Sequence, residues 1–88
     1  MSKLTFSEKA WEDYLYWQLN DKKILKKINA LLKDIERGGN LDGIGKPEAL
    51  KDNLLGYYSR RIDYFHRLVY CQKDQIIEII QCKGHYSD

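Results

Sequence analysis

Residues 59–70 read Ser-Arg-Arg-Ile-Asp-Tyr-Phe-His-Arg-Leu-Val-Tyr and combine strand-forming side chains with three arginines. β-Branched and aromatic residues favour strands, so this stretch predicts two of them, over 57–62 and 66–72. The link at 63–65 contains neither Gly nor Asn, which leaves a tight hairpin and one long strand both open. We favour the hairpin and organise the rest of the chain around it.

Two more strands are predicted on either side of this stretch in the chain. A turn at 73–75 leads into 75–83, which is apolar in both phases for much of its length. That pattern is typical of a central strand covered on both faces. Close to the N-terminus, residues 3–6 alternate polar and apolar side chains and suit a short strand.

Two helices are predicted between the first strand and the central stretch. Ser7 is a good N-cap for a helix that runs to about Leu19. Spacing of i, i+3, i+4 and i+7 gives this helix an apolar face of Trp11, Tyr14, Leu15 and Gln18. Asn20 and Asp21 break the pattern and cap a second helix, which ends at Gly38-Gly39-Asn40. Its stripe is the strongest periodic signal in the chain and consists of Ile24, Leu25, Ile28, Leu31, Leu32 and Ile35.

The charge of the chain is small and unevenly distributed. The formal net charge is +2, which by itself implies no partner. The basic excess lies in residues 22–88, a mild indication of an anionic partner. Five lysines of the second helix lie mostly off its apolar stripe, and they form either a solvated face or a phosphate-facing surface: Lys22, Lys23, Lys26, Lys27 and Lys33.

A loop at 39–47 is rich in glycine and carries the single proline, Pro47, directly before Glu48. The apolar residues that follow are expected to dock on the core: Ala49, Leu50, Leu54 and Leu55. The predicted element order is β-α-α-β-β-β over one domain, residues 1–88. Such an order predicts an α+β fold, with an antiparallel sheet and two helices packed on one face.

Some classes of site and location are disfavoured by the composition. The two cysteines, Cys71 and Cys82, lie in strand-like runs without a CxxC motif, so we expect two buried thiols. With only two histidines in addition, a structural zinc site has no plausible ligand set. No apolar run has the length of a membrane span and no signal peptide is apparent, so a cytoplasmic location is expected.

Three side chains in the C-terminal half are of types that serve acid–base chemistry at a phosphate: Glu48, Arg67 and His85. Each also has a simpler interpretation. Glu48 could cap a helical turn, Arg67 could pair with a carboxylate on a neighbouring strand, and His85 could be an ordinary surface residue near the terminus. For Lys51, Arg60 and Arg61, surface charge is the simplest interpretation, and Tyr86 could be a packed lid.

Several motifs in a fixed order make one family resemblance specific. The chain resembles the YoeB/Txe toxins of bacterial type II toxin–antitoxin systems, within the RelE superfamily, over nearly its whole length. The motifs are Trp-Glu-Asp-Tyr-Leu-Tyr-Trp-Gln at 11–18, Lys-Lys-Ile-Asn at 26–29, Gly-Lys-Pro-Glu at 45–48, Leu-Lys at 50–51, Ser-Arg-Arg-Ile at 59–62, His-Arg-Leu-Val-Tyr at 66–70 and His-Tyr at 85–86.

The resemblance implies a RelE-like (microbial RNase-like) fold and a ribosome-dependent endoribonuclease that cuts mRNA in the A site without a metal or other cofactor. By the same resemblance Glu48 is the general base, Arg67 stabilises the phosphate in the transition state and His85 is the general acid. Tyr86 would help to orient the substrate. Lys51 and Arg61 match family positions that approach RNA phosphates.

The resemblance also implies partners. These are a cognate antitoxin of the YefM/Axe kind, the ribosome with its mRNA, a second copy of the chain in a homodimer, and operator DNA through the antitoxin complex. Two alternatives of the same fold are a non-enzymatic, ParE-like inhibitor of DNA gyrase and a catalytically silent protein that binds RNA or antitoxin. The chain departs from the family pattern where Ser87 and Asp88 extend past His-Tyr and where Gly84 precedes His85, which favours a looser tail.

Overall fold

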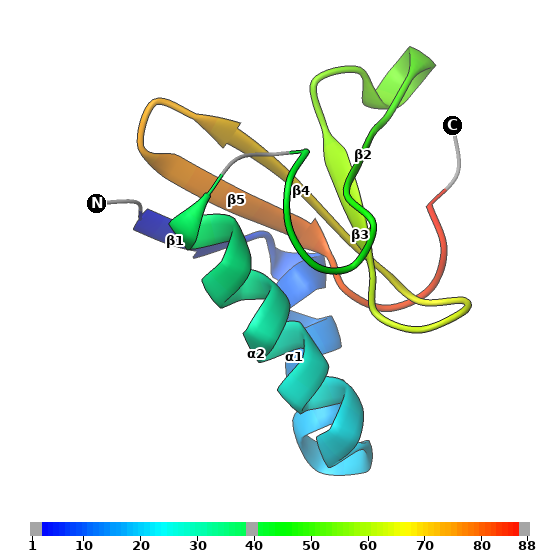
Figure 1. The fold of residues 1–88 in the computed structure, drawn as a ribbon. Coiled ribbons are helices and arrows are strands. Elements are labelled where there is room, and N and C mark those ends of the chain that lie inside the picture. Colours follow the sequence, from blue (N-terminus) through cyan, green and yellow to red (C-terminus); the bar gives the residue numbers. More distant parts are fainter. Residues whose placement is uncertain (1–2, 39–40, 87–88) are drawn as a thin grey trace.

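The computed structural model describes residues 3–38 and 41–86 as two helices packed on a five-stranded sheet (Figure 1). The helices and strands are β1 Lys3–Phe6, α1 Glu8–Asn20, α2 Lys22–Arg37, β2 Glu48–Ala49, β3 Tyr58–Arg61, β4 Arg67–Lys73 and β5 Ile76–Gln81, with a short 3₁₀ turn at Asp52–Leu54. Both helices lie on one side of the sheet in Figure 1. The predicted α+β fold and element order are therefore confirmed, with the two-residue strand β2 added.

The strand order in the sheet is β1-β5-β4-β3-β2. Neighbouring strands are antiparallel except at one edge, where β1 pairs with β5 in parallel. The sheet is thus mixed rather than wholly antiparallel, since β1 and its neighbour β5 are joined by a long crossover that includes both helices and not by a tight turn. β3 and β4 form the hairpin that we favoured for 57–72. The strand β2 was missed because two residues carry no periodic signal.

The predicted stripe of α2 is confirmed. Ile28, Leu31, Leu32 and Ile35 are buried, and Ile24 and Leu25 pack against them at the rim of the core. Asp21 caps the helix by accepting hydrogen bonds from the backbone N–H groups of Lys23 and Ile24. Gly38 is the C-cap, and the predicted stop signals Gly39 and Asn40 lie outside the described residues.

The predicted apolar face of α1 is largely wrong, since Tyr14 is the one of its four residues that packs against the core. The side chains that α1 buries are Ala10, Asp13 and Trp17, whereas Trp11 is 49% exposed and Leu15 is also exposed. Two polar contacts set this rotation, because the Asp13 carboxylate accepts a hydrogen bond from the Cys82 backbone N–H (3.1 Å) and the Trp17 indole donates one to the Cys82 carbonyl (2.8 Å). A hydrophobic pattern scores Asp13 as a surface residue and so selects the wrong face.

Two further expectations are only partly met. In the segment after Glu48, Leu50 is buried, but Ala49 is exposed and Leu55 is 77% exposed, so these two do not dock on the core. Cys82 is a buried thiol, and its burial, reinforced by the charge of Asp13, raises its pKa to about 12. Cys71 is only partly buried. Over the described ranges, neither helix is long and apolar enough to cross a membrane.

Candidate active site

Predicted site residues of the strands lie together on the sheet face that points away from the helices, as the strand pairing shows. Opposed residues of antiparallel strands share a face, as do residues two apart in one strand. Glu48 of β2 is opposite Ser59 of β3, and Ser59 is opposite Val69 of β4. The next row on this face pairs Arg61 with Arg67. One carboxylate and two guanidinium groups therefore lie on the same face.

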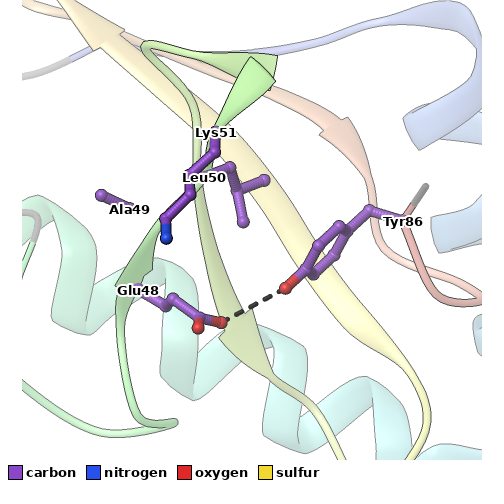
Figure 2. Close-up of a pocket in the computed structure, with 5 residues that line it drawn as sticks. All are labelled: Glu48, Ala49, Leu50, Lys51 and Tyr86. Atoms are coloured by element: carbon purple, nitrogen blue, oxygen red, sulfur yellow. Dashed lines mark hydrogen bonds between the residues drawn. The ribbon is translucent and has the colours of Figure 1, made fainter. Parts of the chain in front are cut away.

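The C-terminal tail brings Tyr86 onto this face. The Tyr86 hydroxyl donates a hydrogen bond to Glu48 Oε1 at 3.2 Å, across a pocket lined by Glu48, Ala49, Leu50, Lys51 and Tyr86 (Figure 2). In Figure 2 the Lys51 side chain extends along the same pocket toward Glu48. Removal from water, together with the charge and hydrogen bond of Glu48, raises the pKa of Tyr86, so this phenol stays protonated and remains a donor.

His85 lies beside Tyr86 at the exposed end of the site. Its ring stacks on the Tyr86 ring with centroids 4.6 Å apart and planes 25° apart, and the Phe65 ring lies 6.0 Å away on the hairpin. The backbone carbonyl of Tyr86 is 2.9 Å from His85 Nδ1. An imidazole in this position is accessible to a substrate and is oriented by two rings and a carbonyl.

Gly84 anchors the tail to the hairpin. Its N–H donates to His66 Nδ1 at 2.8 Å, and its carbonyl accepts from the Arg67 N–H at 3.0 Å and from the Gln81 side chain at 3.0 Å. Its φ of +86° is one that a residue with a Cβ rarely adopts. The looser tail that we expected at Gly84 is therefore wrong in the region that precedes His85, while Ser87 and Asp88 lie outside the described residues.

Arg67 is held by backbone groups. Its guanidinium donates from Nη1 to the carbonyls of Asp63 (3.0 Å) and His66 (3.1 Å). Across the described part of the chain it makes no ion pair with Asp63 or Glu78, the carboxylates that a structural role would have used. The positive charge of Arg67 is close enough to the Tyr86 hydroxyl to oppose the rise in the pKa of Tyr86. Arg67 is thus oriented by backbone carbonyls, and no carboxylate of the described residues pairs with it.

Arg60 is the one predicted surface charge that the structure overturns. Its side chain is 0% exposed and forms an ion pair with Asp34 of α2, while its other donors bond the carbonyls of Asp42 (2.9 Å) and Ile44 (3.1 Å) and the Tyr70 hydroxyl (3.2 Å). The physical reason is the pleat, since neighbours in a strand point to opposite faces. With Arg61 on the open face, Arg60 must point toward the helices.

The structure therefore brings the predicted residues together to different degrees. Glu48 contacts Tyr86 directly, His85 stacks on Tyr86, and Lys51 lines the same pocket. Arg61 lies opposite Arg67 and lines a second pocket with Lys27 and Lys46. Within the described ranges, no group of three or more His, Cys, Asp or Glu side chains could hold a metal ion.

Sequence reasoning missed the residues that support this site. Asp63 holds the hairpin turn, because its carboxylate accepts from the backbone N–H groups of Phe65 (2.8 Å) and His66 (2.6 Å). Although desolvation opposes this, these two hydrogen bonds lower the pKa of Asp63. An Asp two residues before the bonded N–H is a known turn signal and could have been read. The buried Ser59, whose side chain interacts with the Tyr86 hydroxyl, carries no comparable signal.

Comparison with known proteins gives a consistent result. Residues 6–86 match the family described as YoeB-like toxin of bacterial type II toxin–antitoxin system. The chain is 57% identical to the toxin YoeB of Synechocystis, over 97% of this chain and 98% of that protein.

Solved structures agree with the sequence comparison. In the heterotetrameric YoeB–YefM toxin–antitoxin complex of Staphylococcus aureus, one chain is 62% identical, with a TM-score of 0.90 over 98% of this chain and 99% of that one. The YoeB dimer of the same organism is also 62% identical, with a TM-score of 0.91 over 97% and 98% of the two chains.

Proposed function

Because this chain belongs to the family of YoeB-like toxins of bacterial type II toxin–antitoxin systems, we propose that it is a ribosome-dependent mRNA interferase that inhibits translation. The reaction is cleavage of mRNA in the ribosomal A site by general acid–base chemistry, without a metal. One observation carries the proposal. The Glu48 carboxylate and the Tyr86 hydroxyl meet at 3.2 Å on an open face that also carries Arg67 and the stacked ring of His85.

In the proposed reaction, Glu48 takes the proton of a ribose 2′-hydroxyl, whose oxygen attacks the adjacent phosphorus. Arg67 stabilises the negative charge that grows on the phosphate oxygens. His85 gives a proton to the 5′-oxygen as the P–O bond breaks. The products are a 2′,3′-cyclic phosphate, which can open to a 3′-phosphate, and a 5′-hydroxyl. Positioned proton transfer contributes about 10²–10⁴-fold in rate, and loss of one charge stabiliser costs roughly 10²–10³-fold.

The remaining site residues orient and bind. Tyr86 holds one oxygen of Glu48 by its hydroxyl, which leaves the second carboxylate oxygen to act on the ribose. Lys51 lies in the same pocket and Arg61 lies opposite Arg67, where their charges suit the phosphates on either side of the cut. Contacts of this kind bind RNA through charge and are weakened by salt.

The proposed partners follow from the relatives. In Staphylococcus aureus, YoeB forms a heterotetramer with YefM and also a dimer. We propose that a YefM/Axe-like antitoxin covers the open face of this chain, that the chain forms a homodimer, and that operator DNA is contacted only through the toxin–antitoxin complex. Its proposed location is the cytoplasm, where ribosomes and mRNA are found.

The test is primer extension on a defined mRNA in a translation extract. Glu48→Gln and His85→Gln should each lower cleavage by two or more orders of magnitude while the melting temperature stays unchanged. Glu12→Gln, on the exposed surface of α1, is the matched control and should cut like the unmodified protein. Full cleavage by both site variants would exclude the mechanism. Inhibition of supercoiling by DNA gyrase, with mRNA left intact, would favour the ParE-like alternative.

A further inference from the structure

We infer that the tip of the β3–β4 hairpin, formed by Tyr64 and Phe65, is a stacking subsite for the nucleobase that lies 3′ of the cleaved bond. The inference rests on the proposed function and deepens it, because it adds recognition of a base to chemistry at the phosphate. Nothing in the proposed proton transfers uses either ring.

Both rings are open to a ligand. Tyr64 is 94% exposed and Phe65 is 48% exposed, although burying such rings is among the larger apolar gains available to a small domain. Every nucleobase has an aromatic face, so stacking on exposed aromatic side chains is the usual way to hold single-stranded RNA without reading a fixed sequence.

The hairpin tip is held rigidly before any ligand arrives. The Asp63 carboxylate bonds two successive N–H groups of the turn, those of Phe65 and His66. The Ile62 N–H donates a hydrogen bond to the His66 carbonyl at 2.9 Å, which closes the hairpin. The Arg67 guanidinium donates another to the Asp63 carbonyl at 3.0 Å. A platform fixed in this way loses little conformational freedom when it binds a base.

The position of Phe65 decides which nucleotide it would hold. His85 donates its proton to the leaving 5′-oxygen in the proposed reaction, so the nucleotide that carries this oxygen must lie next to the imidazole. The Phe65 ring is 6.0 Å from the His85 ring. The base of the departing nucleotide is therefore the one within reach of Phe65.

A basic pocket on the other side of the tip completes the subsite. Tyr64 lines an open pocket of about 360 Å³ together with Lys27, Lys46 and Arg61. Asp63 also lines it, but its carboxylate is already engaged by the turn. Aromatic rings beside a positively charged groove are the combination that binds single-stranded nucleic acid, with the bases on the rings and the phosphates on the cations.

The experiment combines protein variants with altered RNA. Ribosomes are programmed with mRNA in which the nucleotide 3′ of the cut is either intact or abasic, and kcat and KM are measured. On intact RNA, Phe65→Ala should lower kcat/KM by about 5- to 150-fold, the effect expected for loss of one stacked base, mainly through KM. On abasic RNA the same substitution should lower kcat/KM by less than twofold. Phe65→Trp should retain the activity of the unmodified protein on intact RNA.

Leu19→Ala, at an exposed apolar residue near the end of α1, is the control. It should leave kcat/KM unchanged on both intact and abasic RNA. An equal loss for Phe65→Ala on intact and abasic RNA would overturn the inference. So would full activity with weakened antitoxin binding, which would assign the tip to the antitoxin. Neither result touches the proposed function, which is tested separately by mRNA cleavage with the unmodified protein and with Glu48→Gln and His85→Gln.

Discussion

Arg60 Nη1 lies 2.5 Å from Asp34 Oδ2, in an ion pair that joins β3 to α2 across 26 residues of sequence. The same two side chains also hold the loop between them, because Asp34 accepts from the Ile44 N–H at 3.0 Å and Arg60 donates to the carbonyls of Asp42 and Ile44. The loop leads directly to Glu48. The ion pair on the helix side of the sheet therefore sets where the proposed general base enters the open face.

Removal of the Asp34 charge should destabilise the protein in a pH-dependent way. We expect Asp34→Asn to lower the free energy of unfolding at neutral pH, because the fully buried Arg60 guanidinium loses its counter-charge. The hydrogen bond from Arg60 lowers the pKa of Asp34 below its ordinary value of 3.8. The stabilisation is therefore present above 3.8 and is lost as pH falls through the lowered value.

Urea unfolding at neutral pH and below pH 3.8 checks this prediction. The difference between the two proteins should shrink on acidification, and a difference independent of pH would exclude the charge as its cause. Asp42→Asn is the control, because Asp42 contributes its backbone carbonyl to Arg60.

Gly43 is predicted to tolerate no side chain. A Cβ at this position would lie 1.8 Å from Asp34 Oδ2 and 2.8 Å from Arg60 Nη1, and its φ is +117°. Gly43→Ala should therefore lower the free energy of unfolding by roughly 2 kcal/mol or more, from strain and the displaced ion pair. Gly38→Ala, where a Cβ would meet nothing within 4 Å, should change it by less than about 0.5 kcal/mol. Thermal unfolding of the two variants side by side makes the comparison.

Tyr86→Phe isolates the hydroxyl that contacts Glu48. The variant keeps the ring that stacks on His85 and loses the donor, so Glu48 is left less well oriented. We expect kcat for mRNA cleavage to fall about tenfold or more, as for the loss of a hydrogen bond to a charged group, with an unchanged melting temperature. Tyr16→Phe, on the exposed side of α1, should cut normally. Wild-type cleavage by Tyr86→Phe would show that this hydrogen bond plays no part in the reaction.

Asp13 is predicted to be structural in spite of its charge. Asp13→Ala leaves the buried Cys82 N–H without its acceptor, a loss that costs about 1–3 kcal/mol. The neighbouring exposed Glu12→Ala should be nearly neutral. Denaturant titrations of both variants measure this, and equal stabilities would mean that the Asp13 contact does not hold α1 on the segment that follows β5.

Local rules were sufficient for much of this fold. The stripe on α2, its Asp21 and Gly38 caps and the hairpin strands all depend on residues within a few positions of one another, where spacing and backbone preference act directly. Family resemblance, and no local rule, was what singled out Glu48, Arg67 and His85 from other residues of the same types.

What the sequence by itself determined is the two helices and the strands β1, β3, β4 and β5, with their approximate ends. The tertiary structure alone decided which side of α1 is buried, which arginine of β3 turns inward, and that Glu48 meets Tyr86. The contacts responsible span 69, 26 and 38 residues of the chain. For the first two contacts the physical reason is that a buried polar group must find a partner. In all three the partner comes from a distant part of the chain that only the completed sheet brings within reach.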